Sequence, residues 1–237
     1  MRISELLLTV PTDKNHGVIE REKGHYYGES YDRLLGRFPR DMRSTVLEIG
    51  VQKGGSLKVW SDYFTAAEVI GIDIVDVREP EFRRLERVRF IHSDVKLADT
   101  SALPDGSISI LIDDGSHHLA DVLWVTAHFH AKMRVGGLLI IEDTQAPLEW
   151  LLAIFKQSLR LRSCYRISYR NLRPIGHYDD FLIVLTKVRP AFFLVVQLWN
   201  AMVVAWFASW EVALGLTVRV LRKIVRALEA RRGERAR

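Results

Sequence analysis

Acidic and histidine side chains gather in the segment ILIDDGSHH at residues 110–118, where two aspartates are followed closely by two histidines. Placing such charges close together is costly unless they are paired or bind a metal ion. The segment therefore predicts a metal-binding or proton-transfer site. The alternative interpretation is a solvent-exposed acidic loop capped by its own Ser116.

A second acidic pair, Glu142 and Asp143, ends the next apolar run of the chain. Neighbouring strand ends in a parallel sheet lie about 5 Å apart, so Asp114, Glu142 and Asp143 can converge on one cation. Ligand sets made only of oxygen favour Mg²⁺ or a similar hard ion over zinc. His117 and His118 are further candidate ligands, but beside a hard ion proton transfer is the more natural role for one of them.

A glycine-rich loop lies in LEIGVQKGGS at residues 47–56, directly after an apolar run that holds Glu48. Glycines in a turn that opens a helix let backbone N–H groups approach a ligand closely. The spacing is GxxxGG and not GxGxxG, so the dinucleotide-binding fingerprint is not met. A tight turn without a ligand is the other interpretation of this loop.

Two more acids follow the next two apolar runs. Asp73 stands 25 positions after Glu48, at a strand end where a carboxylate can accept both hydroxyls of a ribose. Asp94 follows the third run, where an adenine edge would lie. The glycine-rich loop, Asp73 and Asp94 follow one another in the order that a nucleoside-containing ligand requires, so we expect such a ligand. The alternative is a tight turn followed by two surface acids.

The elements that would position these residues follow from the pattern of apolar runs. The runs predict strands at residues 45–49, 69–73, 88–92, 108–113, 138–143 and 181–187. Helical spacing predicts helices at residues 56–64, 119–133 and 147–161, and turns are predicted before strands at 104–107 and 136–137. This alternation predicts a doubly wound α/β fold with ligands at the carboxyl ends of the strands.

Composition limits the classes of function. The chain has 237 residues and a single cysteine, Cys164, which excludes an intramolecular disulfide framework and favours a reducing compartment. Its net charge is +5, but residues 1–189 hold equal numbers of basic and acidic side chains. The excess of positive charge therefore lies in residues 190–237, and nucleic acid is not an expected partner.

That last segment begins with a long apolar stretch, AFFLVVQLWNAMVVAWFASWEVALGLTV, and then becomes basic from Arg219. It is long enough to cross a bilayer, which takes about 20 apolar residues. Helical spacing places three polar residues on one face and three tryptophans on another: Gln197, Asn200 and Glu211 against Trp199, Trp206 and Trp210. The pattern predicts an interfacial membrane helix, with a helix packed on the body or forming a dimer interface as the alternative.

Together these motifs resemble the metal-dependent sugar O-methyltransferases. That group acts on macrolide and other natural-product deoxysugars and is related to the cephalosporin-hydroxylase-like family. The resemblance runs from about Thr12 to Lys187 and rests on LEIGVQKGGSLKVW, IGIDI, LIDDGSHH, GGLLIIEDTQ and the upstream TDKNH with Tyr26, Tyr27 and Tyr31. TQAPLEW replaces the aromatic-rich segment that often follows the Glu-Asp pair, which points to a different acceptor pocket. Lys14 and His16 match the upstream motif but receive no chemical role.

The resemblance implies a class I S-adenosylmethionine-dependent fold with a mostly parallel, seven-stranded sheet. It also implies where the cofactor lies. The methionine end would be held by Glu48, Gly50 and Ser56, the ribose by Asp73, and the adenine region by Asp94. By the same resemblance, the Mg²⁺ ligands would be Asp114, Glu142 and Asp143, with His117 as the general base.

The function implied is Mg²⁺-assisted methylation of a sugar hydroxyl in a glycoside. Because the apolar tail lies outside the resemblance, we expect a glycolipid or lipid-linked acceptor at the cytoplasmic face of the membrane. A catechol-type O-methyltransferase and a non-catalytic, membrane-tethered S-adenosylmethionine-binding protein are the alternatives, and a homo-oligomer is open. The expected domains are a helical acceptor-side cap (1–44), the methyltransferase domain (45–189) and the tail (190–237).

Overall fold

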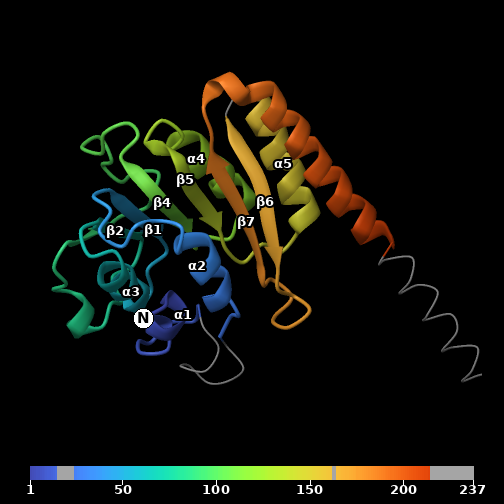
Figure 1. Cartoon of the computed structure of the whole chain (residues 1–237). Helices are drawn as coiled ribbons and strands as arrows, with labels where there is room; N and C mark the ends of the chain where they lie inside the picture. The colour runs from blue at the N-terminus through green and yellow to red at the C-terminus, as the bar shows by residue number, and fades with distance from the viewer. Residues whose placement is uncertain (15–23, 162–163, 214–237) are drawn as a thin grey trace, which may run out of the picture.

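A seven-stranded sheet in the order β3-β2-β1-β4-β5-β7-β6 forms the centre of the protein. The computed structural model describes residues 1–14, 24–161 and 164–213 (Figure 1). Strands β1 to β5 are parallel, and β7 is antiparallel to both of its neighbours. The strands are β1 (Thr45–Ile49), β2 (Glu68–Asp73), β3 (Val88–His92), β4 (Ile108–Asp113), β5 (Met133–Ile141), β6 (Tyr165–Asn171) and β7 (Phe181–Lys187).

Helices cover both faces of this sheet. One face packs against α1 (Ile3–Leu7), α2 (Gly28–Leu35) and α3 (Gly55–Tyr63), and the other against α4 (Leu119–His128), α5 (Pro147–Arg160) and the C-terminal helix Pro190–Ala213. Successive residues of a strand point to opposite faces, so each buried strand contributes to both cores. In β4, Ile110 and Ile112 pack with the first set of helices, whereas Leu111 packs with the second. The predicted doubly wound α/β architecture is confirmed.

All six predicted strands are present, and β6 is the strand that was not predicted. It reads Tyr-Arg-Ile-Ser-Tyr-Arg-Asn and alternates apolar with polar residues instead of forming a continuous apolar run. It lies at the edge of the sheet and pairs only with β7. An edge strand with one solvated face needs fewer apolar residues than a central strand, so its signal is weaker.

Strand β5 begins at Met133, so the predicted turn at residues 136–137 was wrong. Gly136 lies inside the strand with a φ of +85°, and the pairing between β4 and β5 changes register at this point. Glycine tolerates this conformation, which lets the strand absorb extra residues as a bulge. For the same reason α4 ends at His128 and not at residue 133, because the chain must turn into β5.

The C-terminal helix packs on the body through apolar and polar residues. Val204 and Phe207 belong to the core. Asn200 is fully buried, and its amide accepts the N–H of Ile167 at 2.8 Å and donates to the carbonyl of Tyr165 at 2.8 Å. Both partners belong to β6, so the helix satisfies the free backbone groups of the edge strand. Figure 1 shows the helix running beside α5 and β6. The two predicted faces are therefore present, but the polar face is turned inward.

Candidate active site

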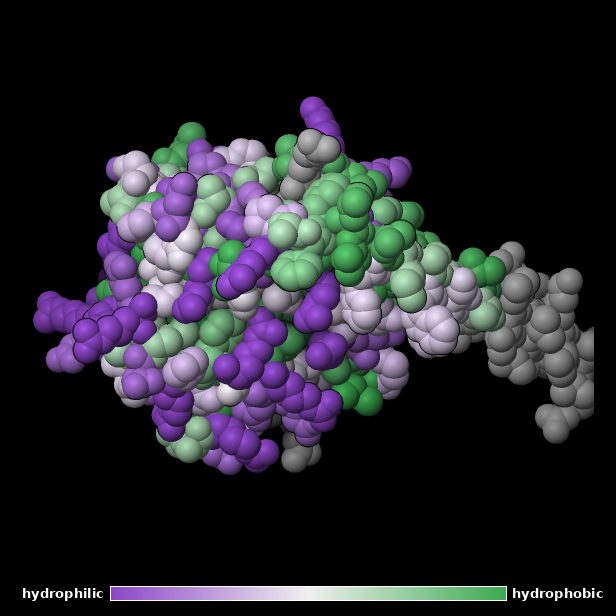
Figure 2. Space-filling model, turned by 45° about the horizontal axis from the view of Figure 1, so that its top comes forward, coloured by the Kyte–Doolittle hydropathy of each residue, from purple (hydrophilic) through white to green (hydrophobic). Residues whose placement is uncertain are grey.

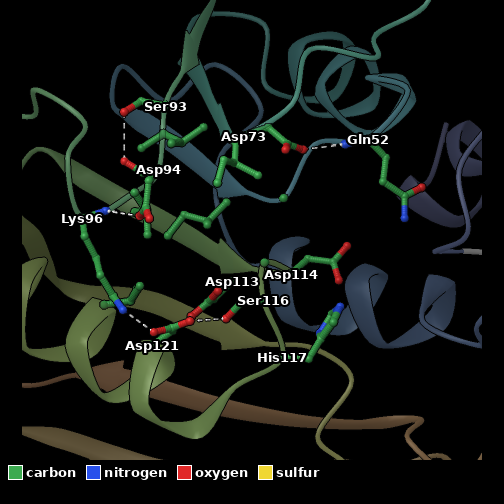
Figure 3. Close-up of a pocket in the computed structure, with 17 residues that line it drawn as sticks. Gln52, Asp73, Ser93, Asp94, Lys96, Asp113, Asp114, Ser116, His117 and Asp121 are labelled. Atoms are coloured by element: carbon green, nitrogen blue, oxygen red, sulfur yellow. Dashed lines mark hydrogen bonds and ion pairs between the residues drawn. The ribbon is translucent and has the colours of Figure 1, made fainter.

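A cavity of about 340 Å³ lies at the carboxyl ends of β1, β2 and β4 (Figure 3). Strands β2 and β3 lie on one side of β1, and β4 lies on its other side, so the strand order reverses between β1 and β4. Open α/β sheets bind their ligands at such a reversal. Asp73 and Asp94 line one part of the wall, and Asp114 and His117 line another.

Gly50 brings the loops after β1 and β4 into contact. Its φ is +81°, and a Cβ atom at this position would lie 2.0 Å from the backbone oxygen of Asp114. The N–H of Asp114 donates to the carbonyl of Ile49 at 2.9 Å. Only glycine fits this close approach, which places Gly50 in the cavity wall beside Asp114.

Asp73 is fixed by the glycine-rich loop. Its Oδ2 accepts the N–H groups of Val51 at 2.7 Å and Gln52 at 3.0 Å, and its Oδ1 accepts that of Val75 at 3.0 Å. Since a carboxylate oxygen can accept two hydrogen bonds, Oδ1 keeps capacity for a ligand hydroxyl. Asp94 accepts the Lys96 N–H at 2.8 Å on the same side of the cavity. Both acids line the cavity, and their contacts with ribose and adenine stay a prediction.

Glu48 and Ser56 do not line this cavity. The Glu48 side chain is fully buried, and its Oε2 accepts hydrogen bonds from Ser56 Oγ at 2.7 Å and Trp60 Nε1 at 3.0 Å. Ser56 lines a small neighbouring hollow instead. The proposed contact of these two residues with the methionine end of a cofactor stays a prediction.

Asp113, which the sequence left without a role, also lines the cavity. Its side chain is 6% exposed, and Oδ2 has no hydrogen-bond partner in the described part of the chain. Burial raises the pKa of this carboxyl to about 7. Its position was visible in the sequence as the first acid of the Asp-Asp pair, but its burial was not.

Asp114, His117 and Asp143 form a group of candidate metal ligands. One ligand atom from each lies within 4.8 Å of the others. His117 and Asp143 both have positive φ values, +52° and +50°, which residues other than glycine rarely adopt. Such strain persists only where the surroundings impose it and is common at functional sites. The two carboxylates suit a divalent cation such as Mg²⁺, and the imidazole beside them suits proton transfer.

Glu142 is held away from this group in the structure. One carboxylate oxygen accepts the hydroxyl of Tyr31, and the other accepts Lys14 Nζ at 2.9 Å. The side chain is 1% exposed. Asp114 and Asp143 are thus brought together as predicted, whereas the role of Glu142 as a metal ligand stays a prediction.

Lys14 is the main residue to which the sequence gave no role. Its Nζ lies 2.5 Å from Asp114 Oδ2, 2.9 Å from Glu142 Oε2 and 3.3 Å from Glu48 Oε1. Burial lowers the pKa of Lys14, but these three carboxylates outweigh it and raise the pKa well above its usual value. The buried ammonium of Lys14 therefore connects Glu48, behind the glycine-rich loop, with Glu142 and with Asp114 of the metal-ligand group.

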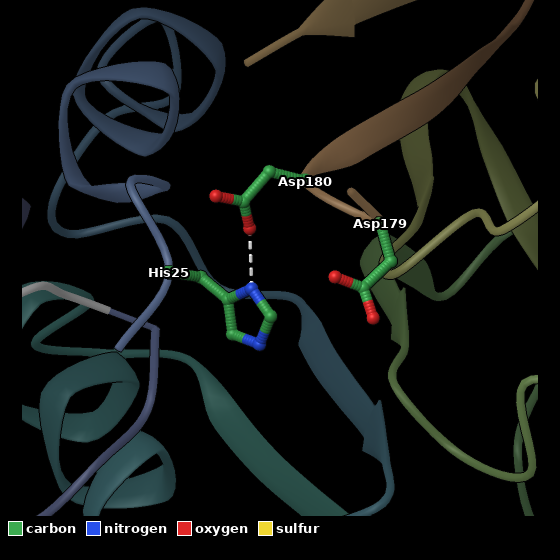
Figure 4. A group of neighbouring side chains, drawn as sticks. All are labelled: His25, Asp179 and Asp180. Atoms are coloured by element: carbon green, nitrogen blue, oxygen red, sulfur yellow. Dashed lines mark hydrogen bonds and ion pairs between the residues drawn. The ribbon is translucent and has the colours of Figure 1, made fainter. Parts of the chain in front are cut away.

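His25 connects the N-terminal segment to Asp143. Its Nδ1 is hydrogen bonded to the fully buried Asp180 (Figure 4). Its Nε2 lies 3.5 Å from Asp143 Oδ2, and its ring stacks on Tyr27 with the ring centroids 5.0 Å apart. Burial lowers its pKa, but Asp180 and Asp143 raise it to about 9. His25, Asp179 and Asp180 also lie within ligand distance of one another. Both ring nitrogens of His25 already face a carboxylate, Nδ1 that of Asp180 and Nε2 that of Asp143, so these contacts form an ion-pair network.

Tyr27 and Tyr31 complete the contacts of the upstream motif. The Tyr27 hydroxyl donates to Asp143, as that of Tyr31 does to Glu142. Both rings are fully buried. The motif itself was the available sequence signal for Lys14 and both tyrosines, whereas His25 was not singled out by the sequence. His16 of the motif lies outside the described residues.

Comparison with known proteins identifies the part of the chain that carries the site. Residues 47–144 match the methyltransferase domain family Methyltransf_24. This part of the chain is similar to methyltransferase domains. It contains the candidate site residues from Glu48 to Asp143.

The relatives of this part of the chain include O-methyltransferases. The mycinamicin VI 2''-O-methyltransferase of Micromonospora griseorubida is 34% identical over 126 residues, covering 50% of this chain and 31% of the relative. The 8-demethyl-8-alpha-L-rhamnosyl tetracenomycin-C 2'-O-methyltransferase of Streptomyces olivaceus is 36% identical over 128 residues, covering 51% of this chain and 34% of the relative. The chain thus spans about a third of the length of these relatives.

The structure is also similar to that of the MycE methyltransferase from the mycinamycin biosynthetic pathway, solved in complex with Mg and SAH. The TM-score is 0.58 at 26% identity, and the match covers 80% of this chain and 55% of MycE. The class I methyltransferase fold predicted from the sequence is therefore confirmed.

Proposed function

We propose that this protein is an S-adenosylmethionine-dependent, Mg²⁺-assisted O-methyltransferase that acts on a sugar hydroxyl of a glycoside. The observation that carries the proposal is the continuity of two sites. Asp114 and His117 belong both to the wall of the cavity and to the metal-ligand group. A cosubstrate in the cavity and a cation at this group would meet at these two residues. The named functions of the relatives support a sugar hydroxyl as the acceptor.

Each residue near this meeting point has a distinct task. Asp73 and Asp94 would hold the ribose and adenine of S-adenosylmethionine, which supplies the methyl group. Asp114 and Asp143 would hold Mg²⁺, which lowers the pKa of a hydroxyl that coordinates it. His117 would take the proton of that hydroxyl as the bond from oxygen to methyl forms and the bond from sulfur to methyl breaks. Lys14 stays charged and balances the buried acids.

The proposal is tested by calorimetric titration with S-adenosylmethionine and with Mg²⁺, followed by assays of labelled methyl transfer to a panel of glycosides and catechols. Asp73→Ala should lose cofactor binding and Asp114→Ala should lose Mg²⁺ binding only. His117→Ala should bind both and lose about 10²- to 10⁴-fold in turnover. A wild-type protein that binds no S-adenosylmethionine would overturn the proposal, and turnover of catechols alone would replace the acceptor class.

We further propose that the acceptor is a glycolipid or lipid-linked saccharide and that the enzyme works at the cytoplasmic face of a membrane. Support comes from the helix Pro190–Ala213, which is long and apolar enough to cross a membrane and whose most apolar window is only 28% buried. The kcat/KM for a lipid-linked glycoside in vesicles should exceed that for the same sugar on a water-soluble aglycone. Equal values for the two acceptors would contradict this part of the proposal.

A further inference from the structure

The outer face of the C-terminal helix is an apolar surface. Within Pro190–Ala213 the exposed large side chains are all apolar or aromatic: Phe192, Leu194, Val195, Leu198, Trp199, Met202, Trp206, Trp210 and Val212. Leu194 is 76% exposed and Trp206 is 71% exposed. Figure 2 shows apolar side chains gathered in one patch on this side of the molecule. A patch of this kind usually marks a binding surface.

An ordinary surface helix turns its polar face to water. Here Val204 and Phe207 pack in the core, and the polar side chains of the helix also turn toward the body. Gln197 Oε1 accepts a hydrogen bond from Ser158 Oγ of α5 at 3.0 Å, and Asn200 bonds both backbone partners on β6. Glu211, the only charged residue between 190 and 213, pairs with Arg173 Nη2 at 2.6 Å.

These bonds also limit how the helix can meet a membrane. A helix that crosses a bilayer must leave the body and place every side in lipid or against another helix. Leaving would strip the hydrogen bonds from Asn200 and from two backbone groups of the edge strand, each costly to bury unpaired. The geometry therefore favours a helix that stays on β6 and presents only its outer face.

Two basic residues of the described chain lie beside the apolar face. Arg189 is exposed directly before the helix, and Arg166 lies over the ring of Trp199 at 5.9 Å from its centroid. Beyond Ala213 the sequence holds eight arginine and lysine residues and two glutamates. An apolar face with cationic flanks is complementary to a membrane that contains anionic lipids.

We propose that this outer face docks flat on an anionic lipid surface while the helix remains bound to β6. The inference rests on the proposed membrane location and specifies that the helix lies in the plane of the membrane while it stays on the body. Arg173 and Asp180 lie on the connection between β6 and β7, where Arg173 binds Glu211 of the helix and Asp180 binds His25 beside Asp143. Docking therefore fixes the acceptor side of the site relative to the lipid surface.

The first experiment is vesicle co-sedimentation of the full chain with phosphatidylcholine alone and with added phosphatidylglycerol. Wild type should bind the anionic vesicles, more weakly at high salt. A triple variant, Leu198→Asn, Met202→Asn and Trp206→Asn, should lose binding by about tenfold or more. Its control removes three other exposed apolar residues, each more than half exposed, and should bind as wild type does: Leu8→Asn, Val77→Asn and Leu97→Asn.

The second experiment measures depth with spin labels, placed one at a time in a Cys164→Ser background at Val195→Cys, Met202→Cys and Ser209→Cys. Positions 195 and 209 are separated by about 20 Å along a helix. In-plane docking predicts similar shallow depths for all three labels. A depth gradient of that size would show a spanning helix and overturn the proposal.

Two further outcomes would also overturn it. One is wild-type protein that ignores anionic vesicles, and the other is a dimer in solution that the triple variant dissociates and that binds no vesicles. Methyl transfer to a water-soluble glycoside separates this inference from the proposed function. If the triple variant keeps that activity and loses vesicle binding, the enzymatic proposal and the docking proposal are both supported. If wild type and the triple variant are both inactive but wild type binds vesicles, only the enzymatic proposal fails.

Discussion

Lys14 Nζ lies 2.5 Å from Asp114 Oδ2, although 100 residues separate the two in the chain. The contact fastens the N-terminal segment over the carboxyl end of β4. Glu48 and Glu142 share the same ammonium, so three buried carboxylates depend on one cation. Removing one partner from a buried ionic cluster leaves uncompensated charge, which is far more costly than losing a surface ion pair.

Lys14→Met should therefore lower the free energy of unfolding by about 3–5 kcal/mol. The methionine keeps the length of the side chain but leaves the carboxylates unpaired. Urea denaturation followed by circular dichroism measures the effect. Lys53→Met is the control, because Lys53 is 57% exposed in its ion pair with Glu79 and should change stability by less than about 1 kcal/mol. Similar losses in the two variants would show that the cluster is not held by charge.

Asp143 and Glu142 are neighbours with different tasks in the structure. Asp143→Asn removes a carboxylate from the metal-ligand group and should weaken Mg²⁺ binding by about tenfold or more. Glu142→Gln instead removes a partner of Lys14 and Tyr31, so its larger effect should be on stability. Calorimetric titration with Mg²⁺ and urea denaturation of both variants separate the two effects. Loss of Mg²⁺ binding in Glu142→Gln alone would reverse the assignment.

Gly50 should not tolerate any side chain. Gly50→Ala places a Cβ atom 2.0 Å from the Asp114 backbone oxygen at a φ of +81°, so the free energy of unfolding should fall by about 3 kcal/mol or more. Gly106→Ala is a matched control, since its φ is +70° but nothing lies within 4 Å of its Cβ position. That variant should lose only the backbone strain, about 1 kcal/mol. Equal losses would mean that the close approach to Asp114 is unimportant.

The ion pair of His25 should make stability depend on pH. Its pKa is raised from 6.5 to about 9, so its contribution is complete below about pH 6.5 and is lost as the pH rises through 9. The contribution is at most about 3 kcal/mol. In the presence of EDTA, urea denaturation at pH 6 and pH 9.5 should show a large difference between wild type and His25→Gln at the lower pH. The difference should shrink at the higher pH, and a constant gap would contradict the charged state.

The order of elements and the position of the acids were readable from local sequence. Continuous apolar runs identify central strands because both faces of such strands are buried, and acids directly after the runs must lie at one edge of a parallel sheet. This is why Asp73, Asp94, Asp114 and Asp143 appear where they were predicted. The glycine at position 50 was identified for the same local reason, namely a turn between strand and helix.

Contacts between distant segments were decided only by the tertiary structure. Nothing near Glu142 in the chain indicates that Lys14 and Tyr31 hold its carboxylate, because this pairing depends on how the N-terminal segment packs over the sheet. The same holds for Asn200, whose helical period defined a polar face but not the direction of that face. The free backbone groups of β6 turned it inward, since hydrogen bonds to an edge strand outweigh the hydration of an amide. Periodicity is a local property of the chain, whereas the partner of a buried polar group is determined by packing.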